Sequence, residues 1–171
     1  MKNTLVKIIR EQTEILFQNL EAQINEAPLN TMFDNVNNSR YLFHAIHSLD
    51  RYFINPHHYE YEAEKIIGID ENLSIIAEDR EGYDAAPGFV IERQKLVEYF
   101  NFVKAKIFSY LDKLTDEQLA EKPEDCPHTK LALILGQYRH LMFHAGLSEA
   151  VNFDTNGTWL KYTGFSYFKN K

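Results

Sequence analysis

Two histidines one helical turn apart carry the strongest chemical signal in the sequence. His140 and His144 lie within YRHLMFHAGLSEAV, residues 138–151. On an α-helix, residues four apart project from the same face, so both imidazoles can bind one metal ion. A metalloprotease of the HExxH type would carry Glu directly after the first histidine as a general base, and Leu141 stands there instead. The pair therefore indicates a metal site of another class, and such a site needs a third ligand.

A second pair of histidines supplies candidates for that third ligand. His44 and His47 lie among apolar positions of YLFHAIHSLDRYF, residues 41–53. Burying several imidazoles in an apolar stripe costs free energy, and a shared metal ion would offset this cost. Three neutral histidines with an open coordination position are typical of catalytic zinc, and imidazole also suits nickel, iron or copper. The residues alone leave open whether His44 or His47 is the ligand, and whether the histidines only form hydrogen bonds within the core.

The spacing of apolar residues predicts four long amphipathic helices that must position these side chains. They are expected at residues 3–27, from a cap at residues 37–39 to just before residue 56, at residues 89–114, and from residue 128 or 129 to residue 151. On the last helix both histidines share a stripe with Leu133 and Leu147, so they are predicted to face the core. Gln137, one turn before His140, is a candidate to orient an imidazole.

The segments between the helices carry weaker signals. Residues 57–88 lack a sustained period and are predicted to form a long connection with one short helix near residues 72–78. Thr115 and Gln118 fit a capping box, which predicts a short helical turn. The Asn156-Gly157 pair predicts a small hairpin or a tight turn. We therefore expect an all-α four-helix bundle, with a long crossover between helices two and three, in a single domain of residues 1–171.

Composition narrows the possible partners. The chain has 171 residues, of which 44% are hydrophobic and 25% charged, and its net charge is −7. No long block of Lys and Arg is present, so nucleic acid and anionic membranes are not expected partners. The first residues lack the features of a signal peptide, and no run of about 18 apolar residues occurs. A cytoplasmic location is expected, and the single Cys126 cannot form an internal disulfide.

Other polar residues have ordinary explanations. His57 and His58 lie in the long connection, where solvated histidines are common. Asp50 is predicted to form a salt bridge with Arg51 or Arg40 rather than to act as a base.

The two histidine segments together resemble the DinB superfamily of DinB/YfiT-like metalloenzymes. PGFVIERQKLVEYFNFVKAKI and TWLKY also fall where members of that family carry similar segments, so the resemblance covers most of the chain. Counting back from Phe53 by the family's spacing places the first ligand at His44, and the second and third ligands fall on His140 and His144. His47 is the reserve ligand.

The resemblance implies a bacterial, homodimeric four-helix bundle that binds zinc, nickel or a similar divalent transition metal. It implies a thiol-dependent transferase, an isomerase or a hydrolase acting on a small molecule. The alternative is a dimeric module that binds a metal or a small ligand without catalysis. The family often carries a further histidine where this chain has Phe143, and Gln where it has Leu147; both changes leave the three ligands in place.

Overall fold

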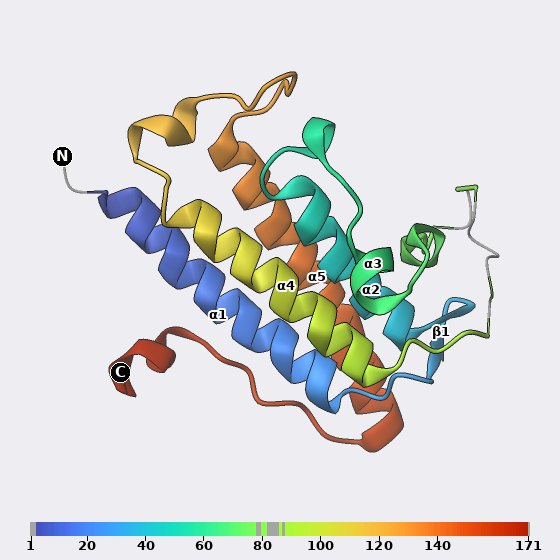
Figure 1. Cartoon of the computed structure of the whole chain (residues 1–171). Helices are drawn as coiled ribbons and strands as arrows, with labels where there is room; N and C mark the ends of the chain where they lie inside the picture. The colour runs from blue at the N-terminus through green and yellow to red at the C-terminus, as the bar shows by residue number, and fades with distance from the viewer. Residues whose placement is uncertain (1–2, 78–79, 82–85, 87, 171) are drawn as a thin grey trace.

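Four long helices make up most of the fold (Figure 1). The computed structural model describes residues 3–77, 80–81, 86 and 88–170. The long helices are α1 (Thr4–Glu26), α2 (Asn38–Tyr52), α4 (Arg93–Leu111) and α5 (Lys130–Asn156). Each lies within, or extends slightly beyond, a helix that the sequence predicts, so the all-α class is confirmed. None of the helices in the described ranges is long and apolar enough to cross a membrane.

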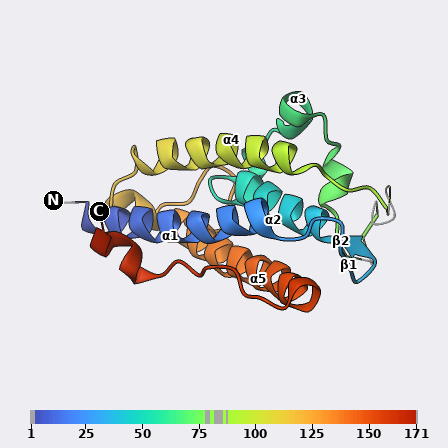
Figure 2. The same ribbon diagram turned by 90° about the horizontal axis from the view of Figure 1, so that it is seen from below.

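The core lies between these helices, because each turns its apolar stripe inward. Helix α2 packs against α4 and α5, and α1 packs against the same two helices (Figure 2). Phe17 of α1 and Phe100 of α4 are almost fully buried, and their rings meet edge to face at 5.5 Å between centroids. Phe43 and Ile46 bring α2 into the same core, and Ile134 brings in α5.

Local signals set the ends of α5. The Thr129 hydroxyl accepts a hydrogen bond from the backbone N–H of Ala132 at 3.2 Å and so caps the first turn. Gly157 adopts φ +70° and ends the helix, since a left-handed residue after the last turn favours glycine. The helix therefore continues beyond Val151 to Asn156. Of the hairpin or tight turn predicted at Asn156-Gly157, the hairpin is wrong, because this glycine forms the left-handed turn that caps α5.

The capping box before the short 3-10 helix η3 (Glu117–Ala120) is confirmed. The Thr115 N–H donates to the Gln118 side-chain oxygen at 2.9 Å, and the Gln118 N–H donates to the Thr115 hydroxyl at 3.4 Å. These two bonds satisfy N–H groups that the first turn of a helix leaves without partners.

A small hairpin occurs where the sequence analysis did not expect one. Strands β1 (Met32–Phe33) and β2 (Val36–Asn37) pair antiparallel directly before α2. Asp34 and Asn35 form the turn with φ of +47° and +63°. Positive φ at both central residues is the geometry of a type I′ turn, which Asn and Asp tolerate.

The connection between α2 and α4 contains more structure than predicted. It holds a 3-10 helix η1 (Pro56–His58), the helix α3 (Ala63–Ile67) and a 3-10 helix η2 (Glu71–Ser74). The short helix predicted near residues 72–78 corresponds to η2 in residues 72–74, but residues 75–77 are not helical and residue 78 lies outside the described residues. Helices η1 and α3 were not predicted. Arg40 of α2 is fully buried and donates to the carbonyls of Leu73 at 3.1 Å and Ile75 at 2.5 Å. These bonds fix residues 73–75 against α2.

After α5, residues 158–170 turn back along α1 and end in the 3-10 helix η4 (Phe165–Asn170) (Figures 1 and 2). Polar side chains bind this tail. The Asn19 side chain donates to the Thr163 carbonyl at 2.9 Å and accepts from the Thr163 N–H at 2.8 Å. The Glu149 carboxylate accepts from the Leu160 N–H at 2.6 Å. The tail is thus held by hydrogen bonds from its backbone to side chains of α1 and α5.

Asn19→Ala is expected to release the tail and destabilise the protein by about 1–3 kcal/mol, since it removes both bonds to Thr163. Urea denaturation measures the loss, and hydrogen exchange should show faster exchange at residues 158–170. Gln18→Ala, at a partly exposed neighbouring position, is the control. Unchanged exchange in the tail of Asn19→Ala would contradict this role.

Candidate metal centre

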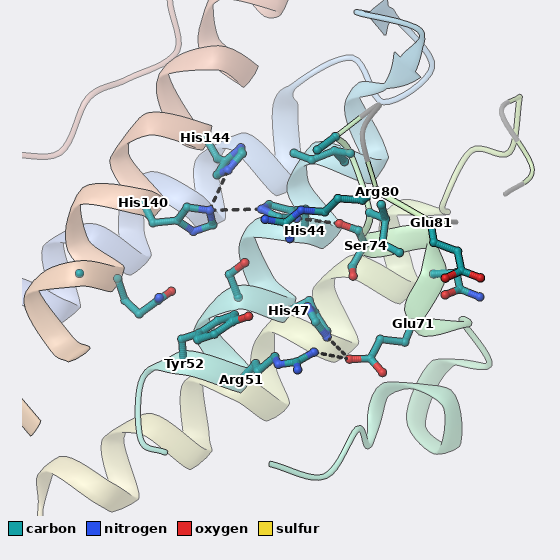
Figure 3. Close-up of a pocket in the computed structure, with 17 residues that line it drawn as sticks. His44, His47, Arg51, Tyr52, Glu71, Ser74, Arg80, Glu81, His140 and His144 are labelled. Carbon is teal, nitrogen blue, oxygen red and sulfur yellow. Dashed lines mark hydrogen bonds and ion pairs between the residues drawn. The ribbon is translucent and has the colours of Figure 1, made fainter. Parts of the chain in front are cut away.

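Three histidines from two helices converge on one point (Figure 3). Helix α2 provides His44, and α5 provides His140 and His144. The Nε2 atom of His140 lies 3.2 Å from that of His44 and 3.0 Å from that of His144. His144 is 4% exposed, and the other two are partly buried. The spacing of four residues places the α5 pair on one face, and packing of α2 against α5 brings His44 to it.

The three imidazoles are neutral at neutral pH. Burial lowers the pKa of His44 to about 4 and that of His144 to about 3. Burial also lowers the pKa of His140. The neighbouring histidines add to the shifts of His44 and His144, because a second positive charge so close is unfavourable. Metal binding requires neutral imidazoles, so burial prepares these side chains for it.

A backbone carbonyl orients His44. The Nδ1–H of this imidazole donates to the carbonyl oxygen of Ser74 at 2.6 Å. The Nε2 atom of the neutral ring therefore carries a free lone pair directed toward the other histidines. Histidine ligands of metals usually donate the other ring N–H in this way.

The geometry fits a divalent transition metal. Ligand atoms about 2.05 Å from an ion lie about 3.3 Å apart in tetrahedral and about 2.9 Å apart in octahedral geometry. The separations of 3.0 and 3.2 Å fall between these values. Without a cation, hydrogen bonds cannot satisfy all three Nε2 atoms. If the Nε2 of His140 carries the proton, its single N–H can donate to the Nε2 of only one of the other two histidines. The buried Nδ1 atoms of His140 and His144 have no protein partner in the described part of the chain.

His47 does not join this group. Its Nε2 lies 2.8 Å from the Glu71 carboxylate, which also contacts Arg51 at 3.3 Å. Burial lowers the pKa of His47, so the contact is a hydrogen bond from a neutral imidazole to a carboxylate. Gln137 does not orient an imidazole as expected, since its side-chain oxygen is buried without a partner among the described residues.

A cavity of about 760 Å³ lies beside the three histidines. Helices α2 and α5 form its inner walls, and η2 with the residues after it forms the outer wall. Four of its lining residues, Tyr52, Asn72, Arg80 and Glu81, are exposed, whereas His44 and His140 are partly buried and His144 is buried. Cavities of this size accommodate small molecules. Sequence reasoning missed Ser74, Glu71 and Arg80, because nothing in their local sequence indicates that they lie beside α2.

Asp50 lies on another face of α2 within a buried network. Its carboxylate accepts hydrogen bonds from Lys106 at 2.5 Å, Tyr99 at 2.9 Å and Tyr59 at 3.2 Å. The predicted salt bridge to Arg51 or Arg40 is therefore replaced by an ion pair with Lys106 of α4. Burial raises the pKa of Tyr99 and Tyr59, with the Asp50 charge acting in the same direction. Both phenols accordingly stay protonated and donate to the carboxylate.

A second group of possible ligands lies on the surface. His58, Glu124 and Asp125 approach one another, and His58 contacts Asp125 at 3.1 Å. All three are exposed, so water solvates them and no burial cost drives metal binding there.

The metal-free protein is expected to lose stability as the pH falls from about 6.5 toward 4. In the unfolded chain histidine has a pKa near 6.5, whereas the folded values are about 4 for His44 and about 3 for His144. Within this window the unfolded chain binds more protons than the folded chain, so acid favours unfolding. The contribution of the neutral histidines to the free energy of unfolding is fully present above a pH of about 6.5, the pKa of histidine in the unfolded chain. Urea denaturation across this range, with chelator present, measures the free energy of unfolding.

His144→Gln should show a flatter pH dependence than the wild type, because one of the titrating groups is gone. His57→Gln, at an exposed histidine, should keep the wild-type slope. An identical slope in His144→Gln and the wild type would refute the assignment.

No family model matches the chain, and no curated protein matches it. A solved structure does resemble it: a conserved protein from Enterococcus faecalis, 19% identical, superposes with a TM-score of 0.67 over 92% of this chain and 99% of that one. At this identity the likeness shows a shared fold and carries no information about function.

Proposed function

We propose that the protein is a metal-dependent enzyme of the DinB-like four-helix-bundle type, in which His44, His140 and His144 bind one divalent transition metal. The observation that carries the proposal is the convergence of three neutral imidazoles, with Nε2 separations of 3.0 and 3.2 Å, at the inner end of a cavity of about 760 Å³. Zinc and nickel are the ions that best suit this donor set.

The bound ion would act as a Lewis acid toward water or a thiol, because three neutral ligands leave its double charge uncompensated. The chain's own residues prepare the site. Burial keeps the imidazoles neutral, and the Ser74 carbonyl holds His44 in the tautomer that leaves Nε2 free. The cavity beside the histidines offers space for a small molecule. We therefore propose transfer, isomerisation or hydrolysis of a small substrate in the cytoplasm, with a low-molecular-weight thiol as one candidate reactant.

Metal analysis of protein purified without a histidine tag or a chelating column tests the metal centre. We expect close to one zinc or nickel ion per chain. The proposal fails if the purified protein contains no stoichiometric transition metal and binds none with near-micromolar affinity.

A non-catalytic module that binds a metal or a small ligand is the second candidate, because the same buried histidines would serve for sensing or storage. Thiol-transfer and ester-hydrolysis assays with metal present separate the two. Turnover that is lost in a folded His140→Ala variant supports the enzyme, whereas metal binding without turnover on either substrate class favours the module.

We also propose a homodimer. Exposed apolar side chains on α5 and the tail support it, since apolar side chains that join into a contiguous exposed patch mark interfaces, as the stacked Phe153 and Trp159 do. They include Leu135, Phe143 and Phe153 of α5, together with Trp159, which stacks on Phe153 at 4.3 Å. Analytical ultracentrifugation should give twice the chain mass.

A further inference from the structure

The charges around the cavity suggest what kind of molecule it takes. Among the described residues, four ionised side chains line it: Arg51 and Arg80 are positive, and Glu71 and Glu81 are negative. The histidines are neutral, so these four charges balance. A divalent cation on the proposed metal centre would leave the cavity positive in a chain whose net charge is −7. Such a cavity attracts an anion and disfavours a cation.

Arg80 offers the most available positive group. It is exposed, and no ion pair or hydrogen bond of its side chain occurs among the described residues. The guanidinium lies close enough to His44 for its charge to act on that imidazole, although burial is the main influence on this histidine. Figure 3 shows its side chain reaching toward His44. An anion held by Arg80 would therefore have its other end directed at the three histidines.

Arg51 provides a second cationic group on the α2 wall. One Nη atom contacts Glu71 at 3.3 Å, and the guanidinium lies over the rings of Tyr52 and Tyr59. The side chain is 41% exposed, and its Nε atom is buried without a partner among the described residues, so Glu71 uses only part of the hydrogen-bonding capacity of the guanidinium. Guanidinium groups bind carboxylates through two parallel hydrogen bonds.

We propose that the cavity binds a small molecule that carries a carboxylate, which pairs with Arg80 and with the N–H groups of Arg51 that Glu71 leaves unused while the reactive group of the molecule faces the three histidines. Only the placement of the reactive group rests on the proposed metal centre. The pairing of the carboxylate with the arginines does not depend on it. A carboxylate matches the planar guanidinium of Arg80, because two parallel N–H groups can donate to its two oxygens.

Matched thiols test the assignment on metal-loaded protein. 3-Mercaptopropionate, 3-mercaptopropanol and cysteamine share a thiol but end in a carboxylate, a hydroxyl and an ammonium group. Titration of the cobalt-substituted protein, followed by its absorption spectrum, gives the three dissociation constants. We expect 3-mercaptopropionate to bind at least about tenfold more tightly than the alcohol, because a charge-assisted hydrogen bond stabilises its complex by about 1.4 kcal/mol or more, and cysteamine to bind most weakly.

Variants that remove either a positive or a negative charge from the cavity provide a second test. Arg80→Gln should remove most of the preference for the carboxylate, and Arg51→Gln a smaller part. Glu71→Gln should strengthen carboxylate binding, because the amide keeps an acceptor for His47 while the competing charge is lost. Lys122→Gln, at an exposed position away from the cavity, changes the net charge equally and should have no effect.

Glutarate binding to metal-free protein, measured by NMR chemical shifts, separates this inference from the metal centre. Arg80-dependent binding supports the carboxylate site even if no metal binds. Equal affinities for the three thiols, or affinities unchanged in Arg80→Gln, would overturn the inference whatever the metal analysis gives. Tighter binding of inorganic phosphate than of glutarate would also overturn it.

Discussion

His140→Ala is expected to lower metal affinity by more than about 100-fold. His140 is the middle member of the three histidines, because its Nε2 atom lies within 3.2 Å of both of the others. Loss of groups that merely orient a ligand already costs about 10–100-fold in affinity, so loss of a ligand should cost more. Isothermal titration with zinc and nickel measures the change.

The same variant should lose the stabilisation that metal gives. A ligand at 100 times its dissociation constant stabilises the folded state by about 2.7 kcal/mol. We therefore expect added zinc to raise the melting temperature of the wild type but not that of His140→Ala, and chelator to abolish the difference. His58→Ala, at an exposed histidine, should respond like the wild type. A His140→Ala protein that binds metal as tightly as the wild type would exclude His140 as a ligand.

Asp50→Ala is expected to cause the largest loss of stability, about 2–4 kcal/mol, because it removes a buried carboxylate that accepts three hydrogen bonds and leaves the partly exposed Lys106 without its counter-charge. The Asp50 side chain is 0% exposed, and it accepts hydrogen bonds from Lys106, Tyr99 and Tyr59. The variant would remove the acceptor that three donors from α4 and the connection after α2 share, and Lys106 would keep only its contact with the carbonyl oxygen of residue 50 at 3.4 Å. Chemical denaturation measures the free energy of unfolding.

Two further variants test whether the loss of stability in Asp50→Ala comes from its ion pair with Lys106. Lys106→Met combined with Asp50→Ala should lose less than the sum of the single changes, since the two side chains interact directly. Glu62→Ala, which breaks an exposed pair with Lys65, should change stability by less than about 1 kcal/mol. A loss of that small size in Asp50→Ala would show that the network contributes little.

Local sequence was sufficient for the long helices and their ends. The recurrence of apolar residues at three and four positions predicted α1, α2, α4 and α5, because this recurrence sets which face a helix can bury. The capping groups of Thr129 and Thr115 act within one turn of the chain, so they could also be read locally. The hairpin before α2 and the helix α3 were missed, since short elements in polar segments leave no comparable periodic pattern.

Contacts between side chains far apart in the sequence could not be predicted from local patterns. Lys106 lies 56 positions after Asp50, and the predicted partners Arg51 and Arg40 were chosen because they are near in sequence. In the structure, those arginines bind Glu71 and the backbone of the connection instead. Charge alone allowed all of these pairings, and only the packing of α4 against α2 selected one.

The candidate metal site was likewise predictable only in part from the sequence. The sequence by itself determined that His140 and His144 share a face of one helix, because a spacing of four residues has only one outcome on an α-helix. The residues alone left both His44 and His47 open, and only the family resemblance favoured His44 with His47 in reserve. Only the tertiary structure decided which of them meets the α5 pair: the rotation of α2 about its axis directs His44 toward α5 and His47 toward Glu71. That rotation is set by how the whole apolar stripe of α2 packs, which no local spacing contains.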